Sequence, residues 1–168
     1  MYCRLCIASN FYIPCTEDKI PTGEKLAVDN TPFDFREEKV IKENILLFNK
    51  KLQMNGNYDH TFVIDGSGFR KGSVCIGDKT GVIIEMYTDC PGVHVYIPSI
   101  VFPGKTKNGA KYCEKNAIWL ETQAYPDSIN HANFPTELLK LVKSIKVQPY
   151  IDLVTLILQR RKYYENDF

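Results

Sequence analysis

Short stretches of alternating residues, separated by glycine and aspartate, limit what this chain can fold into more than any other feature. The segments are Thr61–Asp65, Ser73–Gly77, Val82–Tyr87 and Val93–Ile97. A period of two is that of a strand whose side chains point to opposite faces of a sheet. Several short strands at this spacing predict an all-β fold with antiparallel sheets, in a sandwich or barrel.

Two parts of the chain depart from this strand pattern. In the first, six residues recur at three- and four-residue steps: Val40, Ile41, Asn44, Ile45, Phe48 and Leu52. This spacing predicts an amphipathic helix over Glu37–Met54, packed outside the sheets. The residues after Pro135 also read as helical, although Ile151–Tyr164 fits a second helix or an edge strand. We therefore expect a sandwich over residues 1–135 and a divergent, helical tail over residues 136–168.

Charge and hydropathy exclude several classes of partner. The 168 residues include 21 basic and 20 acidic ones, so the net charge is +1. This balance gives no electrostatic footprint for nucleic acid or for an acidic surface. The longest apolar stretch, near Tyr150 to Leu158, is about half of the roughly 20 residues that a spanning helix needs. We expect a cytoplasmic protein that binds neither nucleic acid nor membrane.

The cysteines and histidines do not form a metal-binding pattern. Cys3 and Cys6 make one CxxC, and no second CxxC or histidine pair follows at zinc-finger spacing. The three histidines are dispersed, and the chain has no GxSxG, P-loop or GxGxxG motif. We expect free thiols packed in strands, no metal and no cofactor.

The segment from Trp119 to Gln123 carries the clearest chemical signal. In a strand, Trp119, Glu121 and Gln123 share one face. An acid, an amide and an indole on one side of a sheet form a carbohydrate platform: the ring packs on sugar C–H groups, and the polar groups bind and deprotonate hydroxyls. The alternative is that Glu121 is a solvated residue on an outward face.

Two further residues are candidates for the same site, each with a structural alternative. Asp59 lies where a loop enters a strand, and a turn-capping aspartate is the alternative. Because neighbours in a strand point in opposite directions, Asp59 and His60 need not act as a pair. His94 lies with Tyr96 on the polar face of its segment, where a hydrogen-bonded structural histidine is the alternative.

Five ordered motifs give the chain a family resemblance. They are Phe11–Pro14 leading to Ile20–Glu24, Thr31–Arg36, Asn57–Phe62, Glu85–Tyr96, and Leu120–Asp127 with Asn133–Pro135. In order, they resemble "YLPV…IPTGE", "TPFDFR", "GYDHNF", "EVYTDQPGVQFYT" and "LETQHFPD…NFP" of the aldose 1-epimerases, also called galactose mutarotases. The resemblance implies part of a large antiparallel β-sandwich, of the mutarotase-like supersandwich type, that binds a hexose on its concave face.

The resemblance also implies roles for three residues. Glu121 matches the family's general base, which removes the proton of the anomeric hydroxyl so that the α and β anomers interconvert. Asp59 matches its sugar-binding aspartate. His94 stands where the family has a glutamine that lines the sugar site. We expect three aromatic residues to border the same concavity: Tyr58, Tyr96 and Trp119.

The chain departs from the family in what it lacks. All its motifs belong to the C-terminal half of the family pattern, and the general-acid histidine of "NHSYFNL" has no counterpart. Three interpretations follow: a truncated aldose 1-epimerase, a non-catalytic carbohydrate-binding remnant, or a glycoside hydrolase-like enzyme that uses Asp59 and Glu121 as paired carboxylates. An open half-sandwich also predicts self-association through the exposed sheet.

Overall fold

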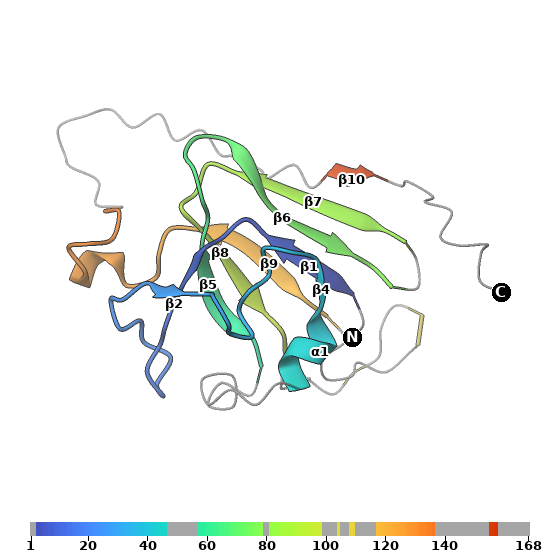
Figure 1. The fold of residues 1–168 in the computed structure, drawn as a ribbon, viewed down its shortest axis with the longest axis horizontal. Helices are drawn as coiled ribbons and strands as arrows, with labels where there is room; N and C mark the ends of the chain where they lie inside the picture. Colours follow the sequence, from blue (N-terminus) through green and yellow to red (C-terminus); the bar gives the residue numbers. More distant parts are fainter. Residues whose placement is uncertain are drawn as a thin grey trace.

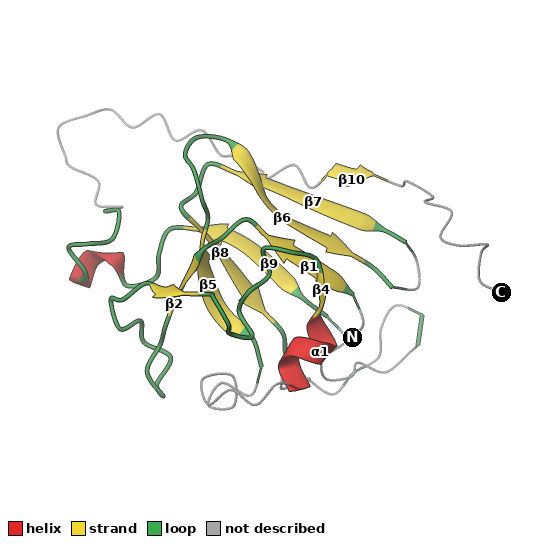
Figure 2. Cartoon of the chain, viewed as in Figure 1, coloured by secondary structure: helices red, strands yellow, loops and turns green. Residues whose placement is uncertain are grey.

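The computed structural model describes residues 3–46, 57–78, 81–98, 104, 108–109, 117–136 and 155–157. Nearly all the regular structure in these residues is β-strand, as Figure 2 shows. Ten strands form two five-stranded sheets (Figure 1), and every strand pair in them is antiparallel. The all-β, antiparallel fold predicted from the sequence is therefore confirmed.

The first sheet has the order β10-β7-β6-β1-β4. Its strands are β1 (Arg4–Ile7), β4 (Lys39–Val40), β6 (Arg70–Ile76), β7 (Ile83–Thr88) and β10 (Thr155–Ile157). The second sheet has the order β3-β2-β5-β8-β9. Its strands are β2 (Phe11–Ile13), β3 (Leu26–Ala27), β5 (Asp59–Val63), β8 (Gly92–Tyr96) and β9 (Trp119–Gln123). The four predicted strand segments correspond to β5, β6, β7 and β8.

The hydrophobic core joins the inner faces of the two sheets. From the first sheet it contains Leu5, Ile7 and Met86, and from the second Phe62, Val93 and Val95, among other buried residues. These positions follow the alternation of the sequence: Phe62 of β5 faces the core, whereas Asp59 and Thr61 lie on the opposite face of the strand. The inner face is mainly apolar, and the polar side chains of β5, β8 and β9 lie mostly on the outer face of the second sheet.

The amphipathic segment is helical over a shorter range than its periodicity predicts. Helix α1 covers Ile41–Leu46, and the two residues before it form β4 instead of a first helical turn. Lys39 and Val40 pair with β1, and the backbone N–H of Ile41 donates to the carbonyl of Cys3 at 3.1 Å. Pairing with β1 thus makes strand out of two residues for which the sequence pattern predicts helix. The remainder of the predicted helix, residues 47–54, lies outside the described residues.

The tail contributes one described strand. Residues 155–157 form β10, which pairs with β7 at the edge of the first sheet. The sequence left this segment open between a helix and an edge strand, and here it is an edge strand. The rest of residues 137–168 lies outside the described part of the chain. Within the described part, no helix is long and apolar enough to cross a membrane.

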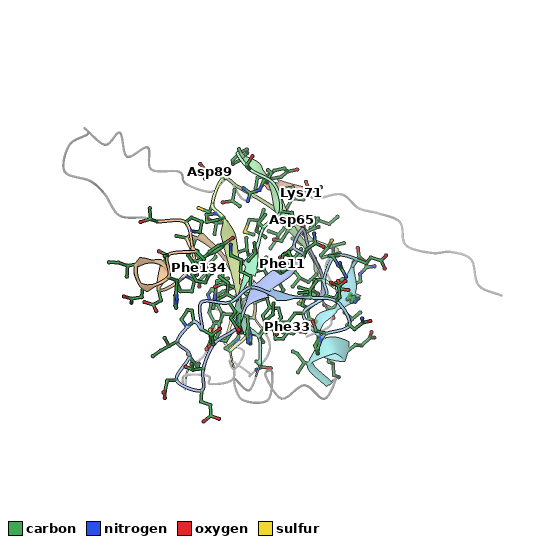
Figure 3. The ribbon with its side chains drawn as sticks, turned by 60° about the vertical axis from the view of Figure 1, so that its left-hand side comes forward. Phe11, Phe33, Asp65, Lys71, Asp89 and Phe134 are labelled. Atoms are coloured by element: carbon green, nitrogen blue, oxygen red, sulfur yellow. The ribbon has the colours of Figure 1, made fainter. Side chains whose placement is uncertain are left out.

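Arg70 ties together the turns at one end of the molecule. Its five guanidinium N–H groups donate to five backbone carbonyls, those of Ile64, Asp65, Gly68, Thr88 and Cys90, at 2.8–3.2 Å. Figure 3 labels Asp65, Lys71 and Asp89 at this same end. The arginine thus joins the β5–β6 turn to the β7–β8 turn.

Gly23 allows two distant loops to pack closely. Its φ is +84°, and a Cβ placed there would lie 2.5 Å from Nδ1 of His131. Its carbonyl also accepts a hydrogen bond from Nδ2 of Asn133 at 2.8 Å. A side chain at this position would meet both backbone strain and a clash.

Replacing Gly23 by alanine is therefore expected to lower the free energy of unfolding by about 2–3 kcal/mol. Gly68→Ala is the matched control, because Gly68 has a φ of +70° and no atom within 4 Å of its Cβ position. It should lose only the backbone-strain contribution of about 1–2 kcal/mol. Urea denaturation of both variants measures the difference, and equal losses would contradict the packing argument.

Candidate functional site

The three neighbouring strands β5, β8 and β9 bring the candidate site residues onto one face of the second sheet. The register places Thr61 opposite His94 and His94 opposite Glu121. One row along, Asp59 lies opposite Tyr96, and Tyr96 opposite Trp119. Residues directly opposite one another in antiparallel strands share a face. The inner face of these strands belongs to the core, so these two rows occupy the outer face of the second sheet.

Asp59 is held by a donor on each of its carboxylate oxygens. Nζ of Lys19 lies 2.7 Å from Oδ2, and Nε2 of His94 lies 3.0 Å from Oδ1. The side chain of Asp59 is only 17% exposed, so both contacts lie at least partly out of water. Asp59 is the first residue of β5, in agreement with its predicted place where a loop enters a strand. Its two donors are a turn residue and a residue of the neighbouring strand.

These contacts lower the pKa of Asp59 well below its usual range. The hydrogen bond from His94 is the largest cause and Lys19 adds to it, whereas burial opposes them. The ionised carboxylate therefore contributes stability that is fully present above the pKa of an unfolded-chain aspartate. That contribution is lost as the pH falls toward the lowered folded-state value. Asp59 is thus an anionic acceptor at neutral pH.

Lys19 reaches the site from a turn that precedes it by forty residues in the sequence. Its backbone φ is +63°, which is unusual for a residue with a side chain. Hydrogen bonds within the turn hold it there, because the N–H of Lys19 donates to the carbonyl of Thr16 at 3.0 Å. The ion pair raises the pKa of Lys19. Sequence reasoning missed this residue, since nothing in its motif indicates a contact with β5.

His94 is hydrogen-bonded through both ring nitrogens. Nε2 contacts Asp59, and Nδ1 lies 3.0 Å from Oγ1 of Thr61. Nε2 of Gln123 in turn donates to the same Thr61 oxygen at 3.3 Å. His94 therefore belongs to a chain of four side chains across β5, β8 and β9, and it is both the hydrogen-bonded strand histidine and a member of the polar site.

Glu121 differs from Asp59 because it is exposed and lacks a side-chain partner among the described residues. It lies on β9 directly opposite His94. A solvated carboxylate with free lone pairs can accept a proton from a bound hydroxyl group. The structure thus brings Asp59, His94 and Glu121 to one face, as the sequence predicted, and gives them different surroundings.

Two aromatic rings stand in the same row as Asp59. The rings of Tyr96 and Trp119 lie 5.2 Å apart between centroids with an interplanar angle of 30°, and Trp119 is 46% exposed. The prediction for Tyr58 was wrong. Its ring is fully buried in the core and its hydroxyl donates to the carbonyl of Pro32 at 2.6 Å. Tyr58 precedes Asp59 directly, so the alternation places it on the opposite face.

The other two histidines have structural surroundings. His60 is buried against Phe33, and its Nδ1 accepts a hydrogen bond from the backbone N–H of Asp59 at 3.1 Å. His131 packs on Phe134 and against Gly23 in the loop after β9. Neither ring therefore belongs to the hydrogen-bonded chain around Asp59.

The sequence of hydroxyl, imidazole and carboxylate in Thr61, His94 and Asp59 has the order of a nucleophilic triad. Thr61 is only 2% exposed, however, and its methyl group packs against the backbone at Gly92. A nucleophile must reach the substrate, and this buried hydroxyl cannot do so.

In the described part of the chain, no three potential metal ligands gather in one place.

Known proteins share both the sequence and the fold. The sequence model of the family "Aldose 1-epimerase" matches residues 3–147. Galactose mutarotase of Pongo abelii is 35% identical over 136 residues, which cover 80% of this chain and 38% of that protein. Aldose 1-epimerase of Haemophilus influenzae is 34% identical over 124 residues, covering 73% of this chain and 36% of that protein.

A solved structure agrees with these relatives in fold. The GalM/aldose epimerase homologue from C. elegans superposes with a TM-score of 0.67 at 24% identity, covering 80% of this chain and 40% of that one. The chain thus spans well under half the length of the proteins that it matches.

Proposed function

We propose that this chain, which belongs to the aldose 1-epimerase family, binds a hexose on the outer face of β5, β8 and β9. In this proposal the chain also supplies the general base for the interconversion of the α and β anomers of the hexose. The observation that carries the proposal is the contrast between two carboxylates on that face. Asp59 is held ionised between Lys19 and His94, whereas Glu121 is exposed and has no side-chain partner among the described residues.

The chemistry follows from this contrast. A carboxylate at Glu121 takes the proton of the anomeric hydroxyl, the bond between the anomeric carbon and the ring oxygen breaks, and the ring oxygen takes a proton from water. Reclosure on the other face of the carbonyl carbon gives the other anomer. Asp59 accepts hydrogen bonds from sugar hydroxyls through the lone pairs that its two donors leave free. Tyr96 and Trp119 offer aromatic surface to the C–H groups of the sugar.

A hydrolase mechanism is less well supported. Glycoside hydrolases need one carboxylic acid that is protonated at working pH, in addition to a second, ionised carboxylate. The pKa of Asp59 is lowered by His94 and Lys19, so this group does not hold a proton at neutral pH. In a hydrolase that used this pair, Asp59 would be the ionised carboxylate and Glu121 would have to be the acid, which is the opposite of the role of base proposed for it here.

Sugar binding with little catalysis is the second candidate, and one observation favours it. The three histidines of the chain are His60, which is buried in the core, His131, which packs against Gly23, and His94, whose ring nitrogens are both engaged. Nε2 of His131 is buried and lies 3.3 Å from Oδ2 of Asp127, so none of the three histidines presents an exposed, unengaged N–H for protonating a ring oxygen. We therefore expect the rate of this chain by itself to be low, because a missing general acid forfeits about 10²–10⁴ in rate.

Titration with a hexose tests the binding half of the proposal. Asp59→Asn keeps the shape of the side chain and removes its charge, so the affinity for glucose or galactose should fall about tenfold to a hundredfold. Chemical-shift changes in ¹H–¹⁵N NMR spectra measure the dissociation constant. Asp78→Asn, in the β6–β7 turn of the other sheet, is the control and should bind like the parent. Equal affinities of the Asp59 variant and the parent would refute the proposal.

The proposal also covers the cellular compartment of the chain and its association with other copies of itself. We place the chain in the cytoplasm, where free hexoses are metabolised, and fractionation of tagged protein tests this. We also expect copies to associate through exposed strand edges, which sedimentation at several concentrations would detect. The large hydrophobic side chains that are exposed in the described residues come from separate elements: Phe11, Ile20, Phe69, Trp119 and Ile129.

A further inference from the structure

The hydroxyl of Thr61 is a buried polar group that sugar binding does not explain. The residue is 2% exposed, and Oγ1 contacts only Gln123 and His94 among the described side chains. It stands in the same row of the face as His94 and Glu121. Thr61 therefore lies within the polar site but beneath the surface that a ligand could touch.

The hydrogen bonds around this hydroxyl have a definite direction. Nε2 of Gln123 donates to Oγ1 at 3.3 Å and occupies one of its lone pairs. A hydroxyl has one hydrogen of its own, which can then point to Nδ1 of His94 at 3.0 Å. A ring nitrogen that accepts carries no hydrogen. In the neutral ring the hydrogen is consequently on Nε2, which faces Oδ1 of Asp59 at 3.0 Å.

The alternative protonation states fit less well. With the hydrogen on Nδ1 instead, the Nε2 lone pair would face an ionised carboxylate at hydrogen-bond distance, and the contact would be repulsive. With hydrogens on both nitrogens, the hydroxyl would receive two donors. Its own buried hydrogen would then lack an acceptor among the described side chains unless the amide of Gln123 turned over.

From these contacts we infer that Thr61 is a positioning residue of the sugar site, which fixes His94 as the Nε2–H tautomer and so directs an N–H at Asp59. Lys19 holds the other oxygen of the carboxylate at 2.7 Å, and the two donors together set the orientation of the acceptor. The consequence for sugar affinity rests on the proposed function, whereas the tautomer does not.

The test compares Thr61→Val, which keeps the shape and removes the hydroxyl, with Thr61→Ser, which keeps the hydroxyl. The first readout is ¹⁵N NMR of histidine-labelled protein, because a protonated and an unprotonated ring nitrogen have well-separated shifts. We expect Nε2–H in the parent and in Thr61→Ser, and a mixture of states in Thr61→Val. The second readout is the dissociation constant for glucose or galactose, which should rise about five- to tenfold in Thr61→Val only.

Several results would overturn the inference. An unchanged His94 spectrum in Thr61→Val would do so, and so would a loss of affinity without a change of tautomer. Protonation of both nitrogens in the parent would show that the chain of hydrogen bonds runs in the opposite direction. If the parent binds neither sugar, the proposed function fails, and the spectra of the two variants still decide whether Thr61 sets the tautomer.

Discussion

Replacing Glu121 by glutamine is expected to lower any catalysed interconversion of hexose anomers by about 10²–10⁴, the usual contribution of one positioned base. Glutamine keeps the shape of the side chain but has no basic form. The residue is exposed on β9, so the change should leave the fold intact. The measurement follows the optical rotation of freshly dissolved glucose or galactose with the parent and with the variant.

A second carboxylate provides the matched control for Glu121. Glu85 lies on β7 of the other sheet, paired with Lys71 at 3.2 Å, and Glu85→Gln should leave the rate unchanged. Catalysis that survives in Glu121→Gln would mean that another group is the base. If the parent shows no rate above the spontaneous one, the binding interpretation remains, and the titration of Asp59→Asn decides it.

Replacing Arg70 by methionine is expected to lower the free energy of unfolding by about 3 kcal/mol or more, because five hydrogen bonds to a charged group are lost. Methionine keeps most of the length and apolar stem of the side chain but removes all five donors. A buried hydrogen bond to a charged group contributes about 1.5–3 kcal/mol to stability. At this half-buried site, water can hydrogen-bond to some of the carbonyls once the five donors are removed, which makes the loss smaller. Arg70→Lys should recover only part of the stability, because one ammonium cannot reproduce a planar fork.

The neighbouring residue separates this effect from a general loss of charge. Lys71 is exposed on the same strand and forms an ion pair with Glu85, so Lys71→Met should change the stability by less than about 1 kcal/mol. Chemical denaturation of the three variants gives the comparison. An Arg70→Met protein as stable as Lys71→Met would show that the five carbonyls do not depend on the guanidinium.

Alternation in the sequence predicted the sheets and the common face of the site. The strands β5, β6, β7 and β8 overlap the segments that the pattern marked, and Trp119, Glu121 and Gln123 share a face as expected. The same rule could have corrected Tyr58, which directly precedes Asp59 and must point the other way. It could also have added Thr61, two residues after Asp59, to the polar face.

Contacts between segments that are distant in the chain could not be predicted from the sequence pattern. Lys19 meets Asp59 because a turn with an unusual backbone conformation carries it across the sheet. The predicted helix is too long at its start for a similar reason. Lys39 and Val40 lie within the segment of helical periodicity, but in the structure they pair with β1. Local pattern determines which face a side chain takes, whereas tertiary contacts determine which turn lies over that face.

The order of strands in the second sheet also bears on motion at the site. Asp59 and His94 stand on β5 and β8, each of which has a hydrogen-bonded strand on both sides, whereas Glu121 stands on β9, one of the two outermost described strands of that sheet. Edge strands open locally at a lower free energy than central ones. We therefore expect the proposed sugar acceptor, Asp59, to stand on the more rigid backbone and the proposed base, Glu121, on the strand that opens more readily. A sugar that contacts both would link the edge to the centre and damp that motion, so part of its binding free energy would be spent on ordering β9.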